Sequence, residues 1–137
     1  MDVVLDANVL FRILISPDDI LDIFFHPELD IAAPVKLLNE FEKNRDEILS
    51  KSQINDVDFS ELLEQLMLKI NIVPIAEYER YLSNAKQLLK EHLKDEDFVA
   101  LSLHLSCNIW TYEDRLFKIG VAVSTKQIKE ELQKHIS

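Results

Sequence analysis

Acidic residues follow the predicted strands of this sequence, where a parallel sheet would place them for chemistry. Asp6 comes directly after residues 3–5, an apolar run that predicts a buried strand. Glu113 and Asp114 follow a second short run at residues 108–111. Sites in open parallel sheets form outside the carboxyl ends of the strands. We therefore expect these acids to converge if the two strands are neighbours.

Three more acids belong to this expected cluster. Glu40 lies in the second turn of the helix predicted over residues 34–50, and Asp95 and Asp97 open the helix that leads into residues 108–111. Carboxylates held close together repel, and the hard cations Mg²⁺ or Mn²⁺ are the usual compensation. Such an ion polarises a phosphoryl oxygen and activates water, so the pattern indicates phosphodiester hydrolysis. Taken singly, acids at helix starts also serve as dipole partners, and a lone surface glutamate is solvated.

Short apolar runs alternate with helical patterns along the chain. The predicted strands cover residues 2–6, 30–34, 70–75, 108–111 and 120–124. The predicted helices cover residues 8–15 (which also fit a strand), 16–25, 34–50, a segment capped by Asp58 or Ser60, and residues 76–93, 95–106 and 125–135. Asn8 and Ser16 are the candidate caps of the first two helices. This order predicts an α/β protein with a mostly parallel sheet of about five strands, in a single domain over residues 1–137.

Composition narrows the class of protein. The chain has 137 residues and a formal charge of −10, which argues against binding nucleic acid through bulk charge but not against a carboxylate nuclease. Cys107 is the single cysteine, which excludes an internal disulfide and favours the cytoplasm. No apolar run reaches the roughly 18 residues of a membrane span. The histidines lack the spacing of a zinc site.

Several basic and aromatic side chains could contact a nucleic acid: Arg12, Lys86, Lys90, Lys94 and Tyr112. The three lysines fall four residues apart on the helix predicted over residues 76–93, which would align them on one face. A solvated face paired with glutamates is the alternative. The arginine could contact a phosphate or neutralise an acid, and the tyrosine could stack on a base. Trp110 we place in the core.

Residues 8–25 carry more large apolar side chains than one helix face normally buries. These side chains either pack inside the monomer, or some of them form a homodimer surface or a groove for a partner segment.

Three segments resemble those of PIN domains: VVLDANVLF, APVKLLNEFEKNRDEIL and KDEDFVALSLHLSCNIWTYEDRLF. PIN domains are small α/β/α nucleases that include the VapC toxins of toxin–antitoxin pairs. The resemblance extends from residue 3 to about residue 124 and implies a three-layer α/β/α sandwich. The last segment is the most specific, because an acid followed by FVALSL, a strand ending in Trp-Thr and then another acid is a distinctive string.

The resemblance assigns the first three acids of the family motif. Asp6 matches the acid after the first strand, and Asn8 matches the small polar residue two places on. Glu40 matches the acid on the helix. Asp95 matches the third acid by its spacing to the small residues of the helix, with Asp97 as the second candidate.

The fourth acid departs from the family pattern, which is Thr-x-Asp. Here Thr111, a candidate supporting hydroxyl, leads to Glu113, and Asp114 comes next. Either Glu113 takes the role with a longer side chain, or the backbone shifts to present Asp114.

The resemblance also implies the chemistry. Asp6, Asp95 and one of the two acids after the fourth strand would ligate Mg²⁺ or Mn²⁺, and Glu40 would hold a second ion or orient the attacking water. The protein would be an endoribonuclease that hydrolyses RNA, and the toxin partner of an antitoxin. One alternative is a PIN fold with an impaired site that binds RNA or a protein. Another is a magnesium-dependent phosphatase, although Asn8 stands where an aspartyl-phosphate enzyme normally has a second aspartate.

Overall fold

The strands form one parallel sheet. A computed structural model describes residues 1–134, so the end of the predicted last helix at residue 135, and His135, lie outside the described residues. The strands are β1 (Asp2–Leu5), β2 (Asp30–Pro34), β3 (Ile70–Val73), β4 (Asn108–Trp110) and β5 (Ala122–Val123). Their order is β3-β2-β1-β4-β5, and every neighbouring pair is parallel. The predicted parallel sheet is confirmed, although β5 is shorter than predicted.

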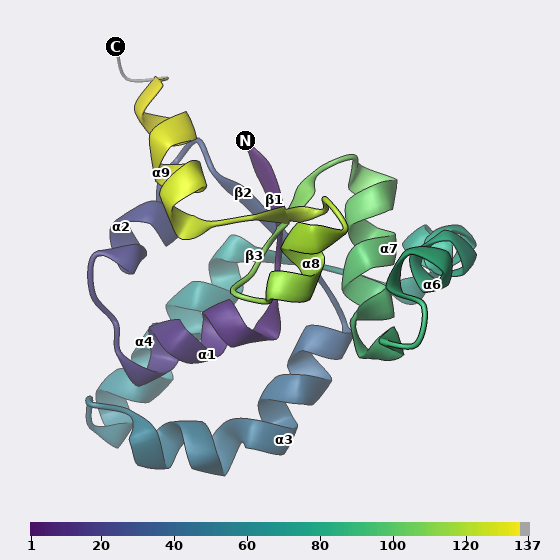
Figure 1. Cartoon of the computed structure of the whole chain (residues 1–137). Coiled ribbons are helices and arrows are strands. Elements are labelled where there is room, and N and C mark those ends of the chain that lie inside the picture. Colours follow the sequence, from purple (N-terminus) through teal and green to yellow (C-terminus); the bar gives the residue numbers. More distant parts are fainter. Residues whose placement is uncertain (135–137) are drawn as a thin grey trace.

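Helices cover both faces of this sheet. In chain order they are α1 (Ala7–Ile15), α2 (Ile20–Phe24), α3 (Lys36–Lys51), α4 (Asp56–Lys69), α5 (Ile75–Tyr78), α6 (Leu82–Leu89), α7 (Glu96–Leu105), α8 (Asp114–Lys118) and α9 (Thr125–Lys134). Helix α7 contacts β1, β2 and β4, and α5 and α6 pack outside it. Figure 1 shows α6 and α7 on one side of the strands and α1, α2 and α4 on the other. The expected three-layer α/β/α sandwich is confirmed.

The strand order reverses between β1 and β4. The chain first builds outward from β1 to β2 and β3, and then returns to add β4 on the other side of β1. Leu5 pairs with Trp110 in register, and the Asp6 N–H donates to the Trp110 carbonyl over 3.0 Å. The two strands therefore end at the same level, at the switch point where doubly wound sheets place their sites.

The sheet is buried because its strands are apolar on both faces. Val3, Val4 and Leu5 are each at most 1% exposed. Trp110 is fully buried, as predicted for the core, and its ring N–H donates to the Thr125 hydroxyl over 2.9 Å. In the apolar segment of residues 8–25, the buried side chains are Val9, Leu10, Ile13, Leu14, Ile20 and Phe24. Most of that segment therefore packs inside the monomer.

Two predicted caps at the start of the chain are wrong. Asp6, not Asn8, caps α1, because Asp6 leaves the strand in an extended conformation and its carboxylate accepts the Ala7 N–H over 2.8 Å. Ser16 ends α1 instead of opening the next helix, and its N–H donates to the Arg12 carbonyl. Helix α2 begins only at Ile20.

The middle of the chain differs from the prediction in two places. Asn55 caps α4 in place of Asp58 or Ser60, because its side chain accepts the Asp58 N–H over 2.9 Å. The long helix predicted over residues 76–93 is broken into α5, a 3-10 turn (η1, Glu79–Tyr81) and α6.

The expected lysine stripe does not form, because α6 ends at Leu89. Lys90 has a φ of 58°, so the helix cannot continue through it. Lys94 lies in a separate 3-10 turn (η2, Leu93–Asp95), and only Lys86 remains on α6. Helix α8 was not predicted. None of the helices within residues 1–134 is both long and apolar enough to cross a bilayer.

Candidate functional site

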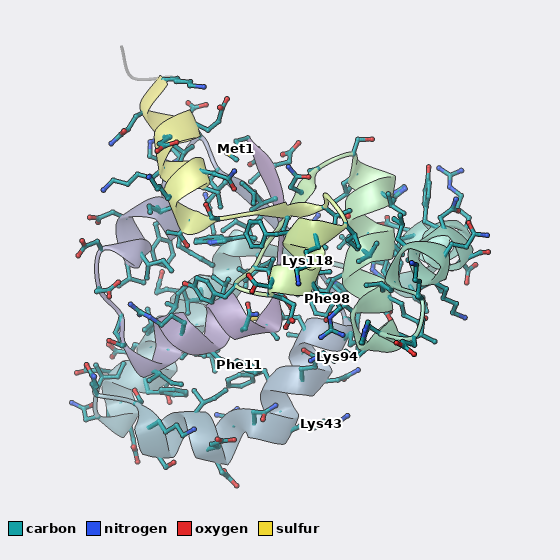
Figure 2. All side chains as sticks on the ribbon, viewed as in Figure 1. Met1, Phe11, Lys43, Lys94, Phe98 and Lys118 are labelled. Carbon is teal, nitrogen blue, oxygen red and sulfur yellow. The ribbon has the colours of Figure 1, made fainter. Side chains whose placement is uncertain are left out.

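Four of the predicted acids line one cavity beside the ends of β1 and β4. The cavity has a volume of about 200 Å³, and the lining side chains are Asp6, Ala7, Asn8, Phe11, Glu40, Lys94, Asp95 and Glu113. The acids come from four separate segments: the end of β1, helix α3, the start of α7 and the end of β4. Phe11 and Lys94, both labelled in Figure 2, also line this cavity. The adjacency of β1 and β4 thus brings together acids far apart in the sequence.

Asp6 is the most constrained of these acids. Its side chain is 6% exposed, with Oδ1 accepting the Ala7 N–H over 2.8 Å and Oδ2 accepting the Thr111 hydroxyl over 2.6 Å. Burial and, to a lesser extent, the charges of Asp95 and Glu113 together raise the pKa of Asp6 from 3.8 to about 6. The hydrogen bonds from Thr111 and Ala7 oppose this rise. The carboxylate is thus held in a fixed position where its ionisation is unfavourable.

Thr111 connects the ends of β1 and β4. Its hydroxyl donates to Asp6, and it accepts the Glu113 N–H over 2.9 Å and the Asn8 side-chain amide over 3.4 Å. One donated and two accepted bonds use the full capacity of a hydroxyl group. The Asn8 amide oxygen in turn accepts the Tyr112 N–H over 3.4 Å. The two polar residues expected to support the site therefore hold its acids through a shared network.

Replacing Thr111 with valine is expected to destabilise the protein by about 1–3 kcal/mol, because valine keeps the shape but leaves buried partners unsatisfied. It should also raise the pKa of Asp6, since the lost hydrogen bond lowers that pKa. Urea denaturation and carboxyl-carbon NMR titration measure the two effects. Thr111→Ser keeps the hydroxyl and serves as the control. An Asp6 pKa that is unchanged in Thr111→Val contradicts the role of this hydrogen bond.

Asp95 and Glu40 are two further acids that line the cavity. Asp95 is 7% exposed, and among residues 1–134 nothing hydrogen bonds to its buried Oδ2 atom. Burial raises the pKa of Asp95, and the charge of Lys94 opposes this rise. Burial likewise raises the pKa of Glu40, and here Lys36 opposes it. The Lys36 ammonium group donates to the Lys94 carbonyl, which places two cations beside the acids.

The alternatives that the sequence left open for the third and fourth acids differ in their position relative to the cavity. Glu113 lines the cavity, where its carboxylate pairs with Arg115 at 3.3 Å. Asp114 begins α8, is exposed and does not line the cavity. Asp97 does not line it either, because its carboxylate accepts the Tyr78 hydroxyl over 2.6 Å. By position, Asp95 and Glu113 are the better candidates.

The residues expected to contact nucleic acid are dispersed. Arg12 neutralises an acid, pairing with Asp18 at 2.7 Å. Lys86 lies 3.9 Å from Glu96, and Tyr112 is 47% exposed. Of the five, Lys94 is the one that lines the acidic cavity in the described part of the chain.

Sequence reasoning missed two charged neighbours of the acids. Lys36 lies four residues before Glu40 on the same predicted helix, and that spacing places both side chains on one helix face. Its role was therefore detectable. Arg115 was not, because its contact with Glu113 depends on the short helix α8.

The donor set fits a hard divalent cation. Within the described chain no three acidic, histidine or cysteine side chains already enclose an ion position. Mg²⁺ does not require this, since it keeps several waters and is usually bound through one or two carboxylates. Asp6 and Asp95 are buried, and the unpartnered Oδ2 atom of Asp95 is a free oxygen ligand. An ion bound there would stabilise the ionised form of Asp6, which burial and the neighbouring acids disfavour.

Comparison with known proteins agrees with this geometry. A search of curated proteins finds no match. The sequence matches the PIN domain family over residues 4–134, which is nearly its full length. PIN domains are generally nucleases and typically use divalent metals. The order of the strands, the acids at the switch point and the match along the chain lead to one conclusion: this chain belongs to the PIN domain family.

Proposed function

We propose that this protein is a metal-dependent endoribonuclease that hydrolyses the phosphodiester bonds of RNA. The observation that carries the proposal is the convergence of Asp6, Glu40, Asp95 and Glu113 on one cavity. Two of these four acids are buried, at 6% and 7% exposure, which disfavours their ionised forms unless a cation is bound. Membership of a nuclease family supports the same reaction class.

Each residue has a role that follows from its position. When bound, Mg²⁺ or Mn²⁺ would polarise the phosphoryl oxygen and lower the pKa of water. Asp6 and Asp95 would hold the ion, and Glu113 lines the same cavity. Glu40 is half-buried and would accept a proton from the attacking water or hold a second ion. The Lys94 ammonium group faces the same cavity and can bind a phosphate oxygen.

Cleavage of an end-labelled single-stranded RNA tests the proposal. We expect wild-type protein to cut this RNA with Mn²⁺ or Mg²⁺, to stop in EDTA and to recover when metal is restored. Asp46→Asn removes an exposed acid of α3 that does not line the cavity, and this control should cut as fast as wild type. Cleavage that persists in EDTA would contradict the proposed metal dependence. Absence of cleavage by folded wild-type protein would contradict the proposed nuclease activity.

The fourth acid can be identified by a matched pair of variants. We expect Glu113→Gln to slow cleavage by about 10- to 100-fold, because Glu113 lines the cavity. Asp114→Asn should change the rate by less than about threefold, because Asp114 is exposed at the start of α8. Initial rates at saturating Mn²⁺ measure the difference. The reverse ranking would show that the backbone shifts to present Asp114.

A second candidate function is a PIN fold with an impaired site that binds RNA or a protein without cutting. It is favoured by Glu113, which stands where the family usually has aspartate and is held by Arg115 at 3.3 Å. In that case wild-type protein would bind RNA but not cleave it with any divalent metal. Glu113→Asp would then restore cleavage by removing one methylene.

We further propose that this protein is a cytoplasmic toxin, that it acts as a homodimer and that an antitoxin inhibits it. This rests on the resemblance to VapC toxins and on the single cysteine. Controlled expression in bacteria should arrest growth with wild type but not with Asp6→Asn, and co-expression of a short reading frame next to the gene should restore growth. Light scattering measures the oligomeric state. Unimpaired growth with abundant wild-type protein contradicts the toxin role.

A further inference from the structure

A second and larger cavity lies between α1, α2 and α9. Its volume is about 550 Å³, and the residues that matter for binding are Arg12, Ile20, Ile23, Tyr112, Lys126 and Lys129. Helix α9 packs against α2, as Figure 1 shows, although the two are about one hundred residues apart in sequence. The cavity is thus a product of the tertiary fold and is separate from the acidic cavity.

The rim of this cavity is cationic in a chain whose formal charge is −10. Lys126 and Lys129 are both exposed, and their spacing of three residues places them on one face of α9. Within residues 1–134 neither lysine forms an ion pair. Two acids, Asp18 and Asp19, also line the cavity, but Asp18 is already paired with Arg12 at 2.7 Å. The two lysines are therefore available to an anionic ligand.

The cavity also offers an aromatic and apolar surface. Tyr112 is 47% exposed, so its ring can be covered by a ligand. Ile20 is buried and Ile23 is half-buried, and both line the same cavity. An exposed ring beside free lysines is the combination that binds single-stranded nucleic acid, through base stacking and phosphate contacts. An acidic protein segment would use the lysines but has no bases to stack on the tyrosine.

The two cavities adjoin each other. Tyr112, which lines the larger cavity, directly precedes Glu113, which lines the acidic one. The Tyr112 N–H also donates to Asn8, another lining residue of the acidic cavity. Arg12 follows Asn8 by four residues on the same face of α1, a distance of about one helical turn or 5.4 Å. A single strand of nucleic acid bound in the larger cavity would lead directly to the acids of the smaller one.

We infer that the cavity between α1, α2 and α9 binds single-stranded RNA next to the bond that is cut, with Lys126 and Lys129 at the phosphates and Tyr112 under a base. This inference rests on the proposed nuclease function for the identity of the RNA as substrate. The contacts it names are sequence-independent, because phosphates and the faces of bases are common to all sequences.

Binding in EDTA tests this inference without any cleavage. We would measure fluorescence anisotropy of a labelled oligouridylate with the full chain at several low salt concentrations. Lys126→Gln/Lys129→Gln is expected to weaken binding at least about fivefold and to reduce the slope of log K against log salt by about 1.4, since each phosphate contact contributes about 0.7. Tyr112→Ala should weaken binding about tenfold, whereas Tyr112→Phe, which keeps the ring, should stay within about twofold of wild type.

A matched control removes two basic side chains elsewhere. Arg45→Gln/Lys51→Gln changes the net charge equally, but both residues are exposed on α3 and line neither cavity, so we expect this variant to bind like wild type. Equal weakening by both double variants would overturn the inference, because only bulk charge would then matter. Wild-type protein that shows no saturable RNA binding would also overturn it. So would a Lys126→Gln/Lys129→Gln variant that keeps RNA binding but loses binding to poly-glutamate, because the lysines would then serve an acidic polypeptide. If Lys126→Gln/Lys129→Gln cleaves RNA normally with metal and binds it like wild type, this inference alone is contradicted. If the variants show the expected binding pattern but wild-type protein does not cleave RNA, only the nuclease function is contradicted.

Discussion

Asp6→Asn is expected to lower the rate of RNA cleavage by about 100-fold or more and, above pH 6, to stabilise the folded protein. Both effects have one cause. The carboxylate of Asp6 is 6% exposed and lies near two other acids, so its charge is useful to a cation but unfavourable to the fold. Asparagine keeps the shape and one oxygen to cap α1, and it removes the charge. Its amide NH2 cannot accept the Thr111 hydroxyl, so the loss of that hydrogen bond offsets part of the gain.

The direction of the pH dependence follows from the pKa of Asp6. This carboxyl has a pKa of about 6 in the folded protein and an ordinary value of 3.8. Below 3.8 it is protonated in both states and its ionisation does not affect stability. Between the two values the folded protein keeps a proton that the unfolded chain releases, so stability falls as pH rises. Above about pH 6 the full loss is present, up to about 3 kcal/mol.

Urea denaturation in EDTA measures this difference. Near pH 8, Asp6→Asn should have a free energy of unfolding above that of wild type by as much as about 3 kcal/mol, and near pH 4 the gap should close. Asp46→Asn, on the exposed surface, should match wild type at both values. A stability difference between variant and wild type that stays the same from pH 4 to pH 8 would show that the charge of Asp6 is already compensated within the protein. A variant that still cleaves RNA would remove Asp6 from the site.

The position of Asp6 could be predicted because local and global signals agree there. A short apolar run must be buried, and an acid directly after it must lie at the carboxyl end of a strand. The alternation of strands and helices predicted a parallel sheet, which is confirmed, and the structure meets the condition for convergence by pairing β1 with β4. That Glu113 rather than Asp114 lines the cavity could not be predicted, because it depends on α8 beginning at Asp114.

The predicted alignment of Lys86, Lys90 and Lys94 on one helix was wrong, because the sequence lacks the usual signal for the end of a helix there. Helices commonly end at a glycine with positive φ, and Gly120 is the only glycine in this chain. Here Lys90 and Ser106 adopt φ values of 58° and 54° after α6 and α7. Helix α6 contacts η2 and α7, and no local sequence pattern signals the turn at Lys90. The cavity beside α9 was missed for a related reason, because it forms between segments distant in sequence.

Mn²⁺ is expected to raise the melting temperature of the wild-type protein above pH 6, since a bound cation would compensate the buried acids. At one hundred times its dissociation constant the ion would add about 2.7 kcal/mol, or on the order of 10 °C for a chain of this size. Near pH 4 the effect should disappear, because the ion must displace protons from Asp6 and Asp95, whose pKa values are both raised by burial. Differential scanning calorimetry measures this without any substrate.

The Asp6 variant makes this metal experiment decisive. Without metal near pH 8, Asp6→Asn should melt above wild type, because it lacks the unfavourable charge. With saturating Mn²⁺ this advantage should shrink or reverse, because the same charge that destabilises the metal-free protein now binds the ion. Asp46→Asn should follow wild type in both conditions. If Mn²⁺ stabilises wild type and Asp6→Asn equally, the ion binds elsewhere, and the buried carboxylates at the end of β1 do not form the metal site.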